Sequence, residues 1–162
     1  MKVRELTIEN TFLPPPDKFV RCQWKRGWAL STVGLFVYGF LRLIGRKPKD
    51  FHGICRYFEI GKNWGGLEMG WFFIVCKNAS ETLKMHELGH GVFNANVGGL
   101  RTLMYSTGSA CRYWYRRIFR VTKTPYDAWW YEGYATAVGM KYVRECSAEK
   151  PVVGDHRKTS TQ

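Results

Sequence analysis

The chain has 162 residues, of which 45% are hydrophobic and 16% aromatic, so its composition excludes a disordered protein and allows one domain with a modest core. The net charge of +12 favours anionic partners such as lipid headgroups, nucleic acid or acidic substrates. The five cysteines are odd in number and form no C-x-x-C pair, which argues against a disulfide framework or a cysteine zinc site and favours a reducing, cytoplasmic location.

The amino-terminal part of the chain contains one long apolar stretch. Residues 1–10 alternate loosely and suggest a short edge strand, and three prolines at 14–16 break the chain. An apolar helix is predicted over residues 27–45, and its uncharged part is shorter than the roughly 20 residues of a membrane span. A buried or amphipathic helix is the preferred interpretation, ahead of an interfacial membrane helix and a transmembrane span.

The middle of the chain predicts two strands, at residues 54–60 and 70–76. A linker is expected at 48–53, and the turn-rich residues 61–66 suggest a hairpin connection between the two strands. The second strand is a continuous apolar run, which fits either a core strand or the sheet edge along which an extended peptide lies.

The next helix, predicted over residues 82–96, carries the motif H-E-L-G-H. His86 and His90 are four residues apart, so both imidazoles lie on one helix face and can bind one metal ion. Glu87 lies at the edge of that face, where it can reach a metal-bound water as a general base. This arrangement suits zinc. Asn78 or Ser80 can cap the start of the helix, and glycines at 98–99 can end it.

Two further segments follow the motif. Residues 98–109 are expected to form a glycine- and serine-containing loop over the site. Residues 111–123 interleave aromatic and basic side chains. Such a segment fits a solvated helix face, a membrane-surface helix or a binder of single-stranded nucleic acid.

A second helix is predicted over residues 124–145, with Thr124 as its N-cap. It contains small residues that would let another helix pack very close: Gly133, Ala135, Ala137 and Gly139. The polar tail at 147–162 is predicted to be disordered.

A catalytic zinc usually has three protein ligands and one open position. The candidates for the third ligand are Asp127 and Glu132 on the second helix. Glu132 is favoured because an unpaired carboxylate in an aromatic, small-residue setting is costly to bury, and a metal removes that cost. Asp127 is better explained as a residue of the first helical turn.

H-E-L-G-H followed downstream by E-x-x-A-x-x-x-G resembles the gluzincin zinc metallopeptidases, over roughly residues 64–140. The resemblance implies that His86, His90 and Glu132 bind zinc and that Glu87 is the base. Family members often carry an acidic residue, hydrogen-bonded to a zinc histidine, where this chain has Thr136. A threonine hydroxyl can accept that bond more weakly. Candidates for the oxyanion donor are Tyr105, Tyr126 and Tyr131.

Together these features predict an α+β fold, with a small mixed or antiparallel sheet packed on the H-E-x-x-H helix and a second helix that supplies a glutamate ligand. Residues 1–146 are expected to form one domain. The predicted function is zinc-dependent hydrolysis of a peptide or protein substrate, by a cytoplasmic protein for which membrane association is left open. The alternatives are a non-catalytic zinc-binding protein, and a basic protein with a relict metal site that binds an anionic membrane surface or, less expectedly, nucleic acid.

Overall fold

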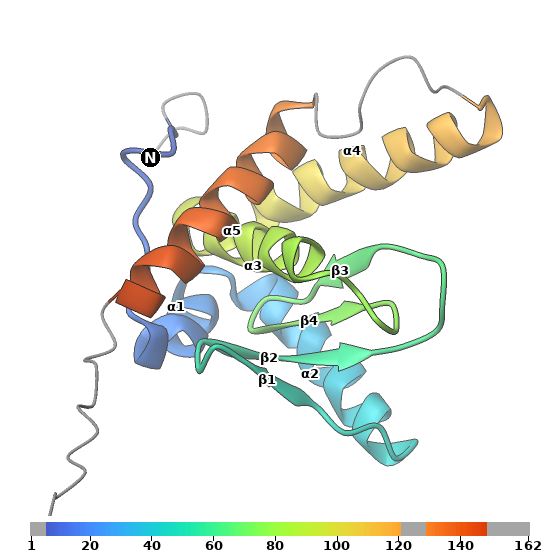
Figure 1. Cartoon of the computed structure of the whole chain (residues 1–162), viewed down its shortest axis with the longest axis horizontal. Coiled ribbons are helices and arrows are strands. Elements are labelled where there is room, and N and C mark those ends of the chain that lie inside the picture. Colours follow the sequence, from blue (N-terminus) through green and yellow to red (C-terminus); the bar gives the residue numbers. More distant parts are fainter. Residues whose placement is uncertain (1–5, 121–128, 149–162) are drawn as a thin grey trace, which may run out of the picture.

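The computed structural model describes residues 6–120 and 129–148 and has the predicted α+β fold, with helices around one four-stranded sheet (Figure 1). A 3-10 turn, η2, spans Pro16–Lys18. The helices are α1 (Phe19–Arg26), α2 (Trp28–Leu43), α3 (Glu81–Val97), α4 (Gly99–Ile118) and α5 (Trp130–Ala148). The strands are β1 (Lys49–Phe51), β2 (Cys55–Glu59), β3 (Gly66–Glu68) and β4 (Phe72–Val75).

The sheet has the strand order β1-β2-β4-β3 and is mixed. Strands β2 and β4 run parallel, and β3 pairs antiparallel with β4. The predicted hairpin between the two main strands is therefore wrong, because β3 lies in the connection and reverses the chain once more. The predicted linker at 48–53 is also wrong in part, since β1 pairs antiparallel with β2.

Strand β4 is an interior strand, and all four of its residues are buried. Of the two interpretations of this apolar run, the core strand is confirmed. The edge beside the metal-motif helix belongs instead to β3, which packs against α3.

The sheet buries both faces, and the side chains alternate between them along each strand. One face packs against α3 and α5, through Tyr57, Phe73 and Val75. The other face packs against α2, through Phe58, Phe72 and Ile74. In Figure 1, α3 and α5 lie above the sheet and α2 passes behind its strands. The helix predicted over 27–45 is thus confirmed as α2, and it is half-buried.

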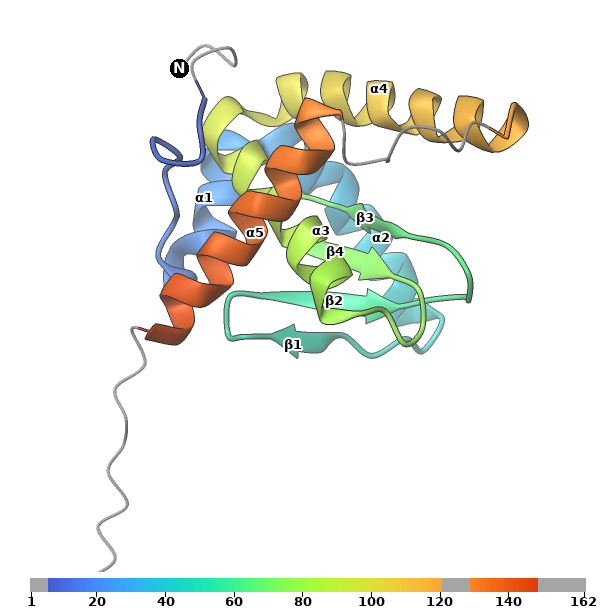
Figure 2. The ribbon, with the colours of Figure 1, turned by 45° about the horizontal axis from the view of Figure 1, so that its top comes forward.

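Helix α4 occupies the segment where a loop was expected, so that prediction is wrong. Gly98, with φ of 91°, ends α3 and lets the chain restart as α4 one residue later. The hydroxyls of Thr102 and Thr107 donate to the carbonyls of Gly98 and Leu103, so these residues fit a helix. Figure 2 shows α4 extending beyond the sheet.

The ends of the described chain differ from the sequence predictions. Residues 6–10 form no strand, and the chain there runs beside α5, where Lys141 Nζ donates to the Ile8 carbonyl at 3.0 Å. Trp129 lies in a bend and α5 begins at Trp130, while the predicted N-cap Thr124 lies outside the described residues. The helix runs on through residues 147 and 148, two residues into the predicted tail, and the rest of that tail lies outside the described residues.

All five cysteines are free in the structure. Among the described residues, no helix combines the length and the apolar character that crossing a membrane requires.

Candidate metal centre

Helix α3 begins after an N-cap serine and ends at a glycine, and the motif residues on it face α5. The Ser80 side chain accepts a hydrogen bond from the Leu83 amide at 3.2 Å, so Ser80 is the N-cap. The helix then runs without interruption through the motif, and the rings of His86 and His90, one turn apart, meet edge to face with centroids at 4.6 Å. The rigid helix therefore sets the separation of the two imidazoles.

Helix α5 crosses α3 in direct backbone contact at two glycines. A Cβ atom added to Gly89 would lie 1.9 Å from the carbonyl oxygen of Ala135. A Cβ atom added to Gly139 would lie 1.8 Å from the carbonyl oxygen of Met85. Neither position admits a larger residue at this separation, so the prediction of close packing is confirmed at Ala135 and Gly139, while these contacts do not involve Gly133 or Ala137. The crossing brings Glu132 of α5 over the histidine face of α3.

The three candidate ligand atoms form a compact triangle. Oε2 of Glu132 lies 3.1 Å from Nε2 of His86 and 3.4 Å from Nε2 of His90, and the two Nε2 atoms are 3.1 Å apart. Tetrahedral zinc with bonds of about 2.0–2.1 Å has ligand atoms about 3.3–3.4 Å apart. The triangle thus has the dimensions of one face of a zinc tetrahedron, and this group could hold a metal ion.

A hydrogen-bond chain fixes how His86 faces this triangle. The Thr136 hydroxyl donates to the Glu132 backbone carbonyl at 3.2 Å, which leaves the hydroxyl oxygen to accept a second bond. Nδ1 of His86 lies 2.8 Å from that oxygen, so we assign the ring proton to Nδ1. Nε2 then turns a lone pair toward Glu132, as metal binding requires.

Glu132 is 1% exposed, and both oxygens of its carboxylate have polar contacts. Ser109 of α4 donates a short hydrogen bond to Oε1, while Oε2 faces the two histidines. Burial raises the pKa of this carboxyl, but the hydrogen bonds from His86 and His90 outweigh that effect and hold the pKa well below its usual range. Glu132 is therefore ionised although it is buried.

These contacts favour positive charge within the triangle. With Nδ1 of His86 donating to Thr136, Nε2 donates to the Glu132 carboxylate only while the imidazole is protonated; in the neutral ring, its lone pair would face the carboxylate oxygen 3.1 Å away and be repelled. Either a proton on the histidine pair or a metal ion removes this repulsion. Burial lowers the pKa of His90, which disfavours a proton there. A metal ion is the alternative to a proton, and this group could hold one.

Glu87 lies one residue beyond the first histidine and is 4% exposed. Its carboxyl group occupies the space where Gly66 of β3 lacks a side chain, since a Cβ atom there would lie 2.5 Å from Oε1 of Glu87. Burial raises the pKa of Glu87 well above its usual range, and the nearby carboxylates of Glu68 and Glu132 raise it further. A dication bound next to Glu87 would favour its ionised form.

Glu68 is a second buried carboxyl group near Glu87. Its Oε1 accepts the Gly70 amide at 2.5 Å, and burial nevertheless raises its pKa to about 8. The edge strand therefore contributes a protonated carboxylic acid next to the candidate base at neutral pH.

The three candidate oxyanion tyrosines differ in their positions. Tyr131 is 1% exposed, and its ring lies against that of His90 with centroids 4.5 Å apart. Its hydroxyl pairs with Ser106 at 3.0 Å, so its position supports orienting His90 and not donation to a substrate. Tyr105 stacks on Tyr131 with centroids 5.6 Å apart. Tyr126, like the rival ligand Asp127, lies outside the described residues.

Sequence reasoning missed three residues at this centre: Ser109, Gly66 and Glu68. Ser109 was assigned to a loop, and only the helical phase of α4 places its hydroxyl on Glu132. Gly66 was assigned to a turn. Glu68 lies in a three-residue strand, which is too short to show a sequence pattern that would identify it as a site residue. Its raised pKa results from burial, which only the folded structure shows.

Comparison with known proteins adds nothing to this geometry, because the chain matches no protein-family model, no curated protein and no solved structure.

Proposed function

We propose that the protein is a zinc-dependent metallopeptidase in which His86, His90 and Glu132 bind the metal and Glu87 is the general base. The observation that carries the proposal is the ligand triangle with edges of 3.1, 3.1 and 3.4 Å, which matches one face of a zinc tetrahedron. Three protein ligands leave a fourth position for water, which is the arrangement of catalytic zinc and not of closed structural sites.

A zinc ion held there would supply Lewis acidity and lower the pKa of water in the fourth position toward about 7. Glu87 would accept a proton from the attacking water as its oxygen bonds to the carbonyl carbon of the peptide, and would return that proton to the amine nitrogen as the C–N bond breaks. Gly66 gives the Glu87 carboxyl group its space, and Glu68 supplies a neutral neighbour. Thr136 keeps the His86 ring in one tautomer throughout.

The position of β3 supports a peptide as the substrate. This strand pairs with β4 on one side only and is the edge of the sheet nearest to α3. An extended peptide can add to such an edge through main-chain hydrogen bonds. The Leu67 side chain is 46% exposed there and offers an apolar contact. A peptide on this edge would pass beside the Glu87 carboxyl group.

The decisive test begins with metal content, measured by mass spectrometry on the wild type, His86→Ala and Glu132→Ala. We expect about one zinc per wild-type chain and a large loss in both variants. The wild type and Glu87→Gln are then compared on a peptide library. Glu87→Gln should keep its zinc and lose hydrolysis, and hydrolysis retained in this variant would refute the proposed mechanism. Absence of zinc from reconstituted wild type would refute the site itself.

A second candidate is a zinc-binding protein without catalysis. The burial of the centre favours it, since Glu87, His90 and Glu132 are at most 8% exposed. Wild type that is loaded with zinc but leaves every peptide of the library intact would establish this candidate.

A further inference from the structure

The net charge of the protein comes entirely from two segments. Residues 18–47 and 99–120 contain 12 of the 25 lysines and arginines and none of the 13 acidic residues, so they account for the whole net charge of +12. The rest of the chain has equal numbers of both signs. These segments form α1, α2 and α4 with their flanking residues. The positive charge is thus concentrated on one group of neighbouring helices.

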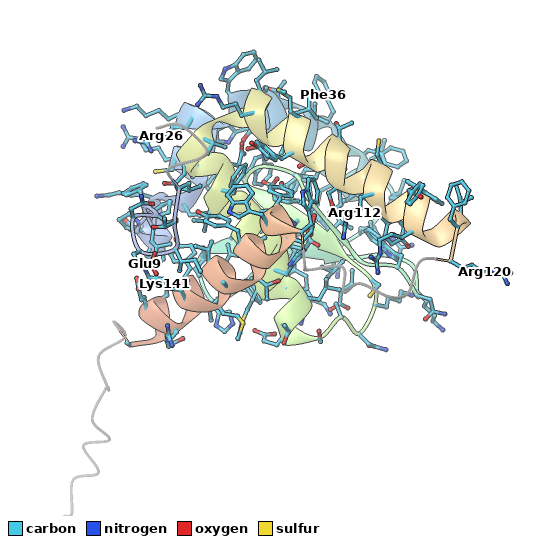
Figure 3. All side chains as sticks on the ribbon, turned by 90° about the horizontal axis from the view of Figure 1, so that it is seen from above. Glu9, Arg26, Phe36, Arg112, Arg120 and Lys141 are labelled. Carbon is cyan, nitrogen blue, oxygen red and sulfur yellow. The ribbon has the colours of Figure 1, made fainter. Side chains whose placement is uncertain are left out.

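Within this group, α2 presents an exposed apolar face, which we name the α2 stripe. Its side chains recur at helical spacing on the side opposite the sheet, and each is between 49% and 85% exposed. The stripe consists of Trp28, Val33, Leu35, Phe36, Phe40, Leu43 and Ile44. In Figure 3, the Phe36 side chain points outward from the body of the molecule. Water is an unfavourable solvent for an apolar face of this extent.

The other face of α2 is fixed to the sheet, where Leu41 packs with Phe58 and Phe72 in a buried cluster. The helix has 16 residues and is held along its length, so it cannot turn to cross a bilayer. It can only lie flat, with the stripe directed into the apolar layer beneath the headgroups. Trp28, which is 66% exposed, stands at the first position of the helix, as interfacial tryptophans do.

Basic side chains occur where the stripe ends. Directly after Ile44, a solvent-open cavity of about 270 Å³ is lined by four bases, Arg46, Lys47, Lys49 and Lys77. It also contains Glu59, which pairs with Lys49 at 2.8 Å and leaves the other three in excess. Lysine and arginine around a small cavity suit a phosphate group. A lipid whose tail meets the stripe would place its phosphate at this height.

Helix α4 contacts α2 and likewise combines basic residues with exposed apolar side chains. It carries arginines and no acidic residue, and Leu100, Met104, Trp114 and Ile118 are each between 58% and 71% exposed. Apolar side chains between bases, with no acid among them, distinguish a membrane-surface helix from an ordinary solvated helix face.

From these observations we infer that the protein docks on an anionic phospholipid bilayer, with the α2 stripe inserted among the lipids and the cavity at Arg46, Lys47 and Lys77 around a headgroup phosphate. The inference is independent of the proposed peptidase activity, since none of these residues belongs to the metal centre.

The test is flotation with vesicles of phosphatidylcholine alone and with about 30% phosphatidylglycerol, at low and high salt. Wild type should bind the anionic vesicles at least tenfold more strongly, and salt should weaken this binding. The double variant Phe36→Glu, Phe40→Glu should lose at least tenfold in partitioning. Lys47→Glu with Lys77→Glu should remove the preference for anionic lipid. Met140→Glu, at a half-exposed methionine of α5, is the matched control and should bind as wild type.

Four results would overturn the inference. The first is equal binding to both vesicle types, and the second is unchanged binding by the Phe36, Phe40 variant with an unaltered circular dichroism spectrum. The third is calorimetric binding of inorganic phosphate without vesicle binding, which would assign the cavity to a free anion. The fourth is absence of vesicle binding by a wild type that forms a dimer sensitive to Phe36→Glu, or that binds a single-stranded oligonucleotide.

Discussion

Replacing Gly139 by alanine should separate the two helices that hold the candidate ligands. The added Cβ atom would lie 1.8 Å from the Met85 carbonyl oxygen, and real Cβ contacts stay above 3.0 Å, so the backbones must part by at least about 1.2 Å along that line. The obstacle is backbone and not a flexible side chain, and it cannot rotate away. Overpacking of this kind costs about 1–3 kcal/mol of folding stability.

The same displacement acts on the ligand triangle. Zinc sites tolerate deviations of about 0.2 Å in ligand distance, and a shift of α5 carries Glu132 away from both histidines. We therefore expect zinc affinity to fall at least about tenfold, equivalent to about 1.4 kcal/mol. The assay is competition with a chromophoric zinc chelator, alongside thermal unfolding with and without zinc.

Gly39→Ala is the matched control. Gly39 lies within α2 with no atom within 4 Å of an added Cβ, so alanine should leave zinc affinity unchanged and stabilise the helix by about 0.5–1 kcal/mol. A cooperatively folded Gly139→Ala protein with wild-type zinc affinity would refute the argument that the glycine contact sets the dimensions of the site.

Three further predictions concern the surroundings of the centre. Gly66→Ala should leave zinc content unchanged and lower peptide hydrolysis at least about tenfold, because the new methyl group displaces the flexible Glu87 carboxyl; unchanged turnover would contradict this. Thr136→Val should weaken zinc binding about tenfold or more in the chelator assay while Thr136→Ser restores it, and equal affinity in all three proteins would remove the role of the hydroxyl. The pKa of Glu68 is about 8 in the folded state and about 4.3 in the unfolded chain, so between these values the folded state binds more protons. Metal-free protein should therefore lose stability as the pH rises from about 5 to 8. Melting temperatures in chelator should show a smaller decline for Glu68→Gln, and an identical decline would place the titrating group elsewhere.

The sequence was most informative where a local signal has a local cause. Ser80 and Gly98 mark the bounds of α3 because a cap and a left-handed residue act within one helical turn. The pairing of His86 with His90 follows from helical spacing alone. Glu132 could be named because a buried carboxylate in a helix of small residues needs a partner, and the structure brings that carboxylate to the two histidines.

The rest depends on contacts between distant segments. Strands β1 and β3 have three residues each, too few to show an alternating pattern, and both are defined by pairing with longer neighbours. The serines and threonines of α4 indicated a loop, but two of its threonines bond back to carbonyls four residues earlier, which a helix allows. The contact of Ser109 with Glu132 joins two helices and depends on how α4 packs against α5, which no local sequence pattern specifies.

That contact has a consequence for denticity. A carboxylate can offer a metal one oxygen or two, and the choice decides how many positions remain for water and substrate. The Ser109 hydroxyl occupies Oε1 of Glu132, so Oε2 alone faces the histidines. In the proposed zinc-loaded centre, this hydroxyl would favour binding through one carboxylate oxygen and a low coordination number. A single serine, on a helix that supplies none of the proposed ligands, would then decide how many coordination positions stay open.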